Sequence, residues 1–338
     1  NREGQMREPR FWAAGLDPWS REAAPLVRSL LTPFAMLYGA ITKRRLAKAK
    51  PLRLDIPVIC VGNLTAGGVG KSPLVADLRA RLSEAYGLRV ASLSRGYGGT
   101  LKGPCRVDTA SHTAKDVGDE PLMLACSGES WIGVDRAEAG LAMADDGVEV
   151  IIMDDGFQNP GLYKDLSIIV VDSVARFGNG HVIPKGPLRE PVAEGLKRAD
   201  AVVIMGDGEG PALPSSFNGP VLRARITPTA TPAPHPYVAF AGIGRPEKFF
   251  DGLEAAGADM RDNVPFPDHH VYTASDLRFL RRLAEERGAR LITTEKDYMR
   301  LSEAQRAGIL TFPVSVVMDD RASLDTLIAG VIRRGSHE

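Results

Sequence analysis

The sequence predicts an α/β protein whose first unit is a mostly parallel β-sheet and whose second unit is a smaller α/β domain. Short apolar runs rich in β-branched residues alternate with stretches of helical periodicity, as in a parallel sheet covered by helices. A glycine-rich loop joins the first of these runs to a helix. Two proline-rich segments, residues 208–220 and 227–236, lie between the two units.

Length and composition agree with this organisation. The 338 residues are enough for two domains, and 44% hydrophobic with 25% charged residues is the balance of a soluble globular protein. We expect an amino-terminal helical segment at residues 6–53, a core unit at 54–226 and a carboxyl-terminal unit at 227–338. The natural chain is expected to begin at Met6.

Charge and cysteine content restrict the possible partners and the compartment. A net charge of zero gives no general attraction to nucleic acid, so no nucleic-acid partner is predicted. The three cysteines are widely spaced and form no C-x-x-C pair, which indicates neither a disulfide framework nor a zinc site. They are Cys60, Cys105 and Cys126. Together with the lack of a cleavable signal pattern, they favour a reducing cytoplasm.

Residues 23–53 contain no acidic side chain and join an apolar stretch to a basic cluster. Arg28 and Pro33 interrupt the apolar stretch, which is too short for a spanning helix of roughly 20 apolar residues. The cations that follow are Lys43, Arg44, Arg45, Lys48, Lys50 and Arg53. This pattern is typical of a helix at a membrane interface. Periodicity alone fits a helix packed on the protein's own core equally well.

The segment TAGGVGKS, residues 65–72, is predicted to bind nucleotide phosphates. An apolar run at residues 55–63 precedes it and a helical pattern at residues 73–87 follows, which is the strand–loop–helix context of a P-loop. Backbone N–H groups and the helix amino end would then face the phosphates, with Lys71 as the cation. The expected binding residues are Thr65, Ala66, Gly67, Gly68, Val69, Gly70, Lys71 and Ser72.

Two positions in this loop depart from related patterns. The strict form G-x-x-x-x-G-K-[ST] has glycine where this chain has Thr65, a change that a loop with a different turn would tolerate. A related form found in ATPases that dimerise around the nucleotide carries a lysine where this chain has Ala66. The sequence therefore does not favour an ATPase of that dimerising kind.

Polar residues follow several predicted strands, and in a parallel sheet they would meet at one edge. Asp154 and Asp155 end a strand within residues 148–159 and suggest a magnesium site, although adjacent acids can also cap a turn. Arg95 and Tyr97 follow another strand and are expected at the same edge. Two further buried strands are predicted within residues 167–172 and 199–207.

Other acidic and histidine residues have simple structural interpretations when taken alone. Asp119 and Glu120 precede Pro121 at a helix start, where acids commonly cap the amino end. His269 and His270 lie in a loop before a helix, and no third histidine or cysteine at a familiar spacing suggests a metal.

The carboxyl-terminal unit is predicted to alternate strands with helices. Strands are expected within residues 237–244, 290–296 and 311–318, and helices at 246–256, 274–287 and 321–333, while a strand at 221–226 lies between the two proline-rich segments at the end of the core unit. Two units joined by a hinge would suit an enzyme that closes around its substrate.

Eight motifs in one order carry a family resemblance. They are GNLTAGGVGKSP, SRGYGG, VGDEP, DDGFQN, PKGPLREP, FAGIGRPEKFF, FPDHHVYT and TTEKDYMRL. Together they resemble the tetraacyldisaccharide 4'-kinase family, from the amino-terminal helix to about Arg300. The resemblance implies a RecA-like P-loop core with a smaller carboxyl-terminal domain. It also implies transfer of the ATP γ-phosphate, with Mg²⁺, to the 4'-hydroxyl of a tetraacylated glucosamine disaccharide 1-phosphate, giving lipid IVA in lipid A biosynthesis.

The resemblance also implies a location and a role for the basic amino-terminal segment. The substrate is a lipid, so residues 6–53 are expected to form an interfacial anchor at an anionic membrane surface. The expected location is peripheral, on the cytoplasmic face of the bacterial inner membrane. No obligate protein partner is evident.

The family's residue roles transfer to matching positions. Lys71 and Ser72 would take the phosphates and magnesium, and Asp119 would accept the proton of the sugar hydroxyl, paired with His269. The acidic magnesium environment would comprise Glu120, Asp154 and Asp155 beside Ser72. Residues expected near the substrate are Arg95, Tyr97, Asn159, Arg189 and Glu190.

One position departs from the family pattern. The family usually has histidine where this chain has Asn159, and an amide cannot titrate near neutral pH. We therefore expect no proton transfer at Asn159.

Two other functions remain possible from the residues alone. One is a P-loop kinase or NTPase with another acceptor, and the other is a nucleotide-gated module at the membrane surface that hydrolyses ATP slowly.

Overall fold

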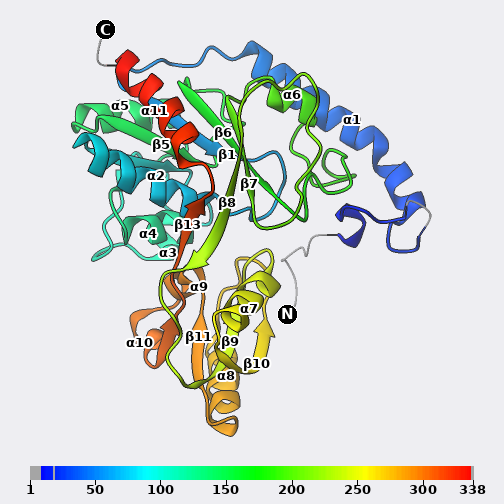
Figure 1. Cartoon of the computed structure of the whole chain (residues 1–338), viewed down its shortest axis with the longest axis vertical. Helices are drawn as coiled ribbons and strands as arrows, with labels where there is room; N and C mark the ends of the chain where they lie inside the picture. The colour runs from blue at the N-terminus through cyan, green and yellow to red at the C-terminus, as the bar shows by residue number, and fades with distance from the viewer. Residues whose placement is uncertain (1–8, 18–19, 336–338) are drawn as a thin grey trace.

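The computed structural model describes residues 9–17 and 20–335 (Figure 1). The start of the expected amino-terminal segment, residues 6–8, lies outside the described residues. Two β-sheets organise the described residues, one of nine strands and one of four. The larger unit occupies the upper part of Figure 1 and the smaller unit the lower part. The predicted α/β class is therefore confirmed.

The nine-stranded sheet places the P-loop strand near its centre. The strand order is β13-β8-β7-β6-β1-β5-β2-β4-β3. All neighbours pair in parallel except β13 with β8 and β3 with β4. The strands are β1 (Val58–Gly62), β2 (Val90–Ser94), β3 (Cys105–Arg106), β4 (Ser130–Ile132), β5 (Val150–Asp154), β6 (Leu166–Asp172), β7 (Ala201–Met205), β8 (Val221–Pro228) and β13 (Val314–Met318). This sheet includes the strands predicted at residues 55–63, 148–159, 167–172 and 199–207, and the strand predicted before Arg95 and Tyr97.

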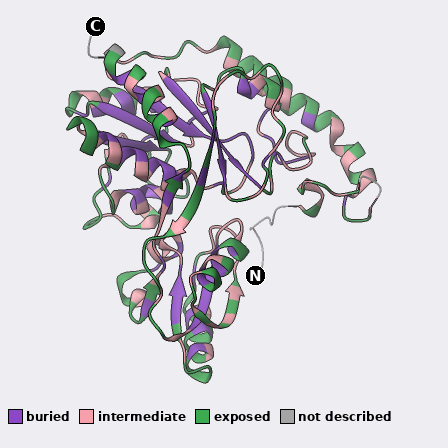
Figure 2. Cartoon of the chain, viewed as in Figure 1, coloured by how far each residue is buried: buried purple, intermediate pink, exposed green. Residues whose placement is uncertain are grey.

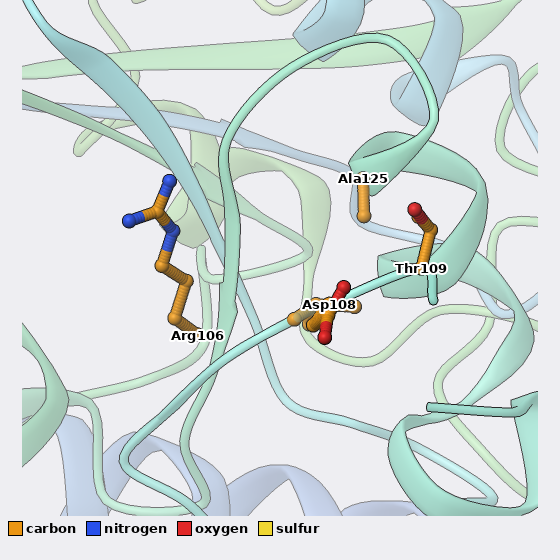
Figure 3. A pocket seen from close by; sticks show the side chains of 5 residues that line it. Arg106, Asp108, Thr109 and Ala125 are labelled. Atoms are coloured by element: carbon orange, nitrogen blue, oxygen red, sulfur yellow. The ribbon is translucent and has the colours of Figure 1, made fainter. Parts of the chain in front are cut away.

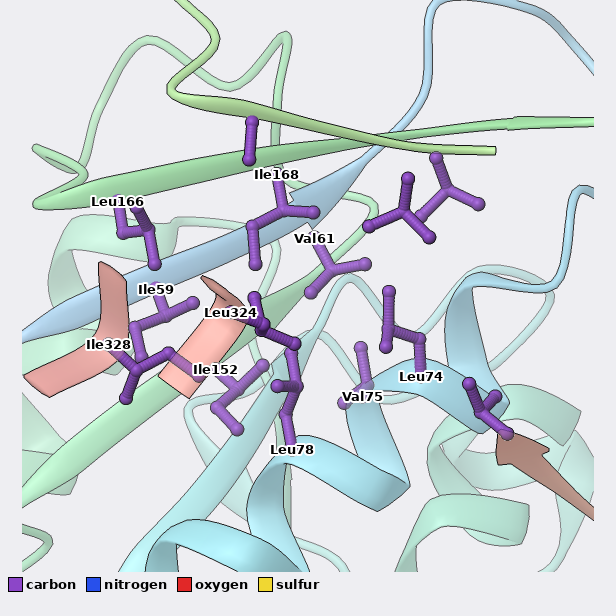
Figure 4. Packing of buried hydrophobic residues seen from close by; sticks show 14 of the residues in the cluster. Ile59, Val61, Leu74, Val75, Leu78, Ile152, Leu166, Ile168, Leu324 and Ile328 are labelled. Atoms are coloured by element: carbon purple, nitrogen blue, oxygen red, sulfur yellow. The ribbon is translucent and has the colours of Figure 1, made fainter. Parts of the chain in front are cut away.

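Helices cover both faces of this sheet. They are α2 (Lys71–Tyr86), α3 (Ala114–Val117), α4 (Asp119–Ala125), α5 (Arg136–Asp145), α6 (Val192–Leu196) and α11 (Arg321–Gly335). Alternate residues of β1 point to opposite faces, as strand geometry requires. Ile59 packs with Leu74 of α2 and Ile328 of α11 in the cluster shown in Figure 4. Cys60 packs on the other face with Met143 of α5. Both faces are apolar and buried, which explains the nearly uninterrupted apolar strand sequences.

The second unit is a four-stranded parallel sheet in the order β10-β9-β11-β12. Its strands are β9 (Pro236–Ala241), β10 (Asp259–Pro265), β11 (Arg290–Thr293) and β12 (Ile309–Thr311). Its helices are α7 (Pro246–Ala255), α8 (Ala274–Glu286), α9 (Glu295–Arg300) and α10 (Glu303–Arg306). Phe240 of β9 packs toward Leu280 of α8, whereas its neighbour Ala239 packs toward Phe250 of α7.

The end of the chain returns to the larger unit. β13 pairs with β8 in the nine-stranded sheet, and Leu324 of α11 lies in that sheet's core. Residues 314–335 therefore lie with the first sheet, although the sequence placed them in the second unit at 227–338. The reason is that β8 and β13 form the connection between the units, so the smaller unit is an insertion between them (Figure 1).

Helix α1 (Pro25–Lys48) runs along the outside of the larger unit, after a short 3-10 turn at Arg10–Trp12 (Figure 1). Figure 2 shows that most of its surface is exposed, and Ala35 is its only buried residue. Its exposed apolar side chains are Leu26, Val27, Leu30, Phe34, Met36, Leu37, Tyr38 and Ile41. Within residues 9–17 and 20–335, no helix has the length and apolar character needed to cross a bilayer.

Candidate active site

The predicted phosphate-binding loop lies between β1 and α2. Gly67 and Gly70 have φ angles of 96° and 87°, a left-handed region that glycine enters without steric cost. Thr65 is not in this region, so the backbone there does not require the glycine of the strict motif. The side-chain amide of Asn63 donates to the Thr65 carbonyl at 2.8 Å and fixes this start of the loop. The departure at Thr65 is thus compatible with P-loop geometry.

The last two residues of the loop contact the two aspartates at the end of β5. Ser72 Oγ donates to Asp154 Oδ2 at 3.0 Å, and Lys71 Nζ lies 3.4 Å from Asp155 Oδ1. The predicted carboxylates are therefore at the loop, beside the hydroxyl of Ser72. The backbone of Asp155 is unusual, because its φ is 53°, and such a conformation costs a non-glycine residue about 1–3 kcal/mol.

The two aspartates have opposite electrostatic environments. Burial, followed by the negative charge of Glu120, raises the pKa of Asp154 to about 7. Asp154 Oδ1 is buried and has no hydrogen-bond partner among the described residues. Burial would also raise the pKa of Asp155, but Lys71 and Arg189 outweigh it and hold that pKa below its usual value. The site thus combines one carboxylate, Asp154, for which the charge of Lys71 does not offset burial, with another, Asp155, that is paired with two cations.

The segment that contains Arg189 and Glu190 pairs with the P-loop. Ala66 N donates to Pro187 O at 2.8 Å, and Arg189 Nη1 donates to both carboxylate oxygens of Asp155 at 2.8 and 3.0 Å. Glu190 is only 3% exposed and accepts hydrogen bonds from Arg198 and Gln158. Both residues predicted in this motif therefore lie at the site. Arg189 contacts the carboxylate of Asp155, and Glu190 contacts Gln158.

Asp119 and His269 meet across the boundary between the units. Asp119 begins α4 in the larger unit, and its Oδ2 lies 3.1 Å from His269 Nδ1 in the smaller unit. His269 has φ 55° and, like Asp155, lies in the left-handed region although it is not glycine. The pair predicted from two motifs 150 residues apart is therefore brought together.

Two cations of α9 contact the acidic residues at the start of α4. Lys296 Nζ donates to Glu120 Oε1 at 2.9 Å, and Arg300 Nε donates to Asp119 Oδ2 at 2.6 Å. Burial would raise the pKa of Asp119, but the hydrogen bond from His269 and the charges of Lys296 and Arg300 outweigh it, so the pKa is lowered. Asp119 is therefore held as a carboxylate.

A loop of the smaller unit also lies against the P-loop. A β-carbon built on Gly244 would be 3.4 Å from the backbone nitrogen of Gly68. Nearby, Arg245 Nη1 lies 2.8 Å from Asp172 Oδ1 at the end of β6, and Lys248 pairs with Asp172 Oδ2. The two units thus meet on both sides of the phosphate-binding loop.

The remaining predicted residues have different surroundings. Arg95 is exposed after β2, while the exposed Tyr97 ring makes an edge contact with His269 at 5.7 Å between centroids. Asn159 Oδ1 accepts the backbone N–H of Gly161 at 2.9 Å in the turn after the aspartates. The side-chain oxygen of Asn159 thus has a local structural contact.

The sequence interpretation missed the roles of Lys296 and Arg300. It identified TTEKDYMRL as a motif but assigned none of its side chains. The available signal was the i,i+4 spacing of the two cations after Thr294, which places them on one face of a short helix. Gln158, whose amide links Glu190 to the carbonyl of Asn63, was also unassigned.

A separate pocket lies near the edge strand β3 and the end of α4 (Figure 3). It is lined by Arg106, Val107, Asp108, Thr109 and Ala125. None of these residues belongs to the P-loop or to the pair formed by Asp119 and His269. The phosphate-binding loop and its carboxylates therefore remain the better candidate site.

Comparison with known proteins finds a family and relatives that are similar to this chain. The model of a family described as tetraacyldisaccharide-1-P 4'-kinase matches residues 27–333. A tetraacyldisaccharide 4'-kinase of Hyphomonas neptunium is 59% identical over 329 residues, which covers 97% of this chain and 99% of that protein. One of Rhodospirillum centenum is 50% identical, with 97% of each chain covered.

A solved structure is also similar. It is an LpxK from Aquifex aeolicus, described as an "apo" form in complex with ATP. Its TM-score is 0.72 at 27% sequence identity, and the match covers 90% of this chain and 99% of that one.

Proposed function

The chain belongs to the tetraacyldisaccharide-1-P 4'-kinase family, and from this membership and the site geometry we propose how its residues carry out the reaction. The enzyme is an ATP-dependent kinase of lipid A biosynthesis. It transfers the γ-phosphate of ATP to the 4'-hydroxyl of a tetraacyl glucosamine disaccharide 1-phosphate and gives lipid IVA.

Residues 65–72 bind the phosphates of ATP. Left-handed Gly67 and Gly70 let backbone N–H groups approach the phosphate oxygens, and the amino end of α2 favours negative charge there. Lys71 exchanges its contact with Asp155 for the phosphate that is transferred, whose charge it stabilises during the reaction. The ATP complex of the Aquifex LpxK supports this assignment.

Ser72, Glu120, Asp154 and Asp155 form the environment of Mg²⁺. The orphaned, buried Oδ1 of Asp154 fits a hard cation, which prefers carboxylate oxygens. Among the described residues, no three carboxylate, imidazole or thiol side chains are arranged to hold a metal ion by themselves, so this would be a site with few direct protein ligands. Such a site suits Mg²⁺, which keeps waters and takes ligands from substrate phosphates. When bound, the ion neutralises charge on those phosphates.

Asp119 accepts the proton of the 4'-hydroxyl as the oxygen attacks the γ-phosphorus. Its Oδ2 lies 3.1 Å from His269 Nδ1, so the imidazole orients the carboxylate and takes part in holding the proton. This inter-unit pair beside a complete P-loop is the observation that carries the assignment. Tyr97, whose ring contacts His269, would bind the sugar and its phosphate together with Arg95 and Arg189.

Helix α1 lies on the membrane surface, peripherally and on the cytoplasmic face of the inner membrane. Its apolar side chains Leu26, Leu30 and Met36 are more than 70% exposed, and its basic end would lie near anionic headgroups. This placement would bring the enzyme to a substrate that stays in the bilayer.

The experiment that tests the function uses γ-labelled ATP, Mg²⁺ and the disaccharide 1-phosphate, with thin-layer separation of the products. Lys71→Ala should lower turnover by about 10²-fold or more, because it removes a charge that acts in the transition state. Lys197→Ala is the control, since Lys197 is an exposed lysine paired with Glu194. Label appearing only as inorganic phosphate would indicate a hydrolytic membrane-surface module instead. Parental turnover in Lys71→Ala would reject the phosphate-loop assignment.

A further inference from the structure

Helix α9 presents two cations to two consecutive acidic residues of the other unit. Lys296 and Arg300 are four residues apart and therefore lie on one face of the helix. Lys296 pairs with Glu120, and Arg300 pairs with Asp119. Both side chains of the second pair are only 7% exposed. The contact is thus buried between the units and is not a solvated surface ion pair.

All three guanidinium nitrogens of Arg300 are engaged. Nε donates to Asp119 Oδ2 at 2.6 Å, and Nη2 lies beside the same oxygen and 3.4 Å from His269 Nδ1. Nη1 donates to Gly242 O at 2.6 Å and to Asp297 Oδ1 at 2.7 Å. The side chain is therefore fixed at both ends of its planar fork.

The support behind Arg300 is itself rigid. Asp297 is fully buried and also accepts hydrogen bonds from Gly242 N at 3.0 Å and Tyr272 Oη at 2.8 Å. His269 N donates to Gly242 O, the same carbonyl that accepts from Arg300. Arg300 and His269 thus belong to one hydrogen-bonded group of the smaller unit, and both meet Asp119 Oδ2.

We propose that Arg300 is a positioning residue for the reaction: it docks on Asp119 when the units close and aligns that carboxylate with His269. The proposal rests on the assignment of Asp119 and His269 as the reacting pair. Without Arg300, the Asp119 side chain would lose two charge-assisted contacts and could rotate away from the imidazole. A displacement of about 1 Å at a reacting group can cost about 10²-fold in rate. Arg300 acts through Asp119 and does not contact the phosphates or the sugar.

The first test compares Arg300→Gln and Arg300→Lys with Arg281→Gln. Arg281 is an exposed arginine of the same unit whose side-chain hydrogen bonds, among the described residues, go to the carbonyls of Gln305 and Ala307. We expect Arg300→Gln to lower kcat by about 10²-fold, while KM for ATP and the affinity for a fluorescent ATP analogue stay within about threefold. Arg300→Lys should recover only part of the rate, because one ammonium cannot bond Asp119, Gly242 and Asp297 together. Arg281→Gln should match the parent.

A double-mutant cycle separates positioning from general support of the fold. In a His269→Gln background, Arg300→Gln should reduce kcat by less than about threefold more, because the alignment it provides is already lost. A loss of kcat in the double variant equal to the product of the two single losses would overturn the proposal. Thermal unfolding of each variant is measured in parallel. If Arg300→Gln unfolds at a lower temperature than the parent, the same double-mutant cycle is measured with Arg300→Lys, which retains the charge.

The outcomes distinguish the positioning role of Arg300 from the assignment of Asp119 and His269 as the reacting pair, on which it rests. Parental turnover in both Asp119→Asn and His269→Gln would reject the reacting pair and the positioning role together. Severe loss in those two variants with parental turnover in Arg300→Gln would reject the positioning role alone. A large rise in KM for ATP in Arg300→Gln would assign Arg300 to nucleotide binding instead.

Discussion

Asp154 combines the two properties that a magnesium ligand at a strand end needs. It is 2% exposed, with one oxygen held by Ser72 and the other without a partner among the described residues. An ionised carboxylate in this position lacks full compensation, which is why burial and then Glu120 raise its pKa to about 7. A divalent cation would supply the missing charge. Asp155 differs because Lys71 and Arg189 already compensate it.

Asp154→Asn should therefore change both magnesium dependence and pH dependence. The amide is a poorer ligand for a hard cation, so the Mg²⁺ concentration for half-maximal activity should rise by about tenfold or more. In the absence of metal, protonated Asp154 stabilises the folded parent because its pKa is raised. This contribution to the free energy of unfolding is fully present below pH 3.8, the usual pKa, and is lost as pH rises through about 7. Urea unfolding in a chelator between about pH 5 and pH 8 should show that decline in the parent and not in Asp154→Asn. If the magnesium titrations of Asp154→Asn and the parent overlap, Asp154 is not a metal ligand and serves only at the turn that follows β5.

At the scale of elements, the sequence predicted what local patterns determine. The apolar run before residues 65–72 and the helical spacing after them placed the P-loop between β1 and α2. The return of β13 to the large sheet was not predictable in this way, because strand pairing between residues about 90 apart in the chain leaves no local signal. Arg300 was missed for a similar reason: its partner Asp119 lies 181 residues away. The family resemblance predicted the Asp119–His269 pair, which composition and spacing alone did not.

Helix α1 exposes a group of large apolar side chains to solvent. Substitutions of these side chains should affect membrane binding. Leu30→Glu with Met36→Glu should weaken flotation with anionic vesicles by about tenfold or more, since burying one such side chain is worth about 1.5–3 kcal/mol. Binding by the parent should also fall as salt screens the basic cluster. Thermal unfolding should be unchanged, because both side chains are more than 70% exposed. Phe279→Ser, at an exposed aromatic of α8, is the control. Unchanged flotation of the double variant would argue against an interfacial helix.

At the scale of the whole molecule, two ion-pair clusters join the units on either side of the P-loop. One consists of Asp119 and Glu120 with the cations of α9, and it contains the residues proposed to react. The other consists of Asp172 with Arg245 and Lys248 at the start of α7. Asp172 is 1% exposed and also caps the turn at Val174 and Ala175. The second cluster therefore fixes the relative position of the units without touching the reacting residues.

Arg245→Gln combined with Lys248→Gln should therefore open the molecule and slow the reaction less than Arg300→Gln does. Both cations are partly exposed, so solvent screening limits their joint contribution to about 1 kcal/mol, or roughly fivefold in the ratio of closed to open molecules. Small-angle scattering should show a larger radius of gyration, and kcat should fall by no more than that factor, because it follows the fraction of closed molecules. Lys197→Gln is the matched control, because its partner Glu194 lies in the same unit. Scattering and turnover equal to the parent would mean that the α9 contacts alone hold the units together.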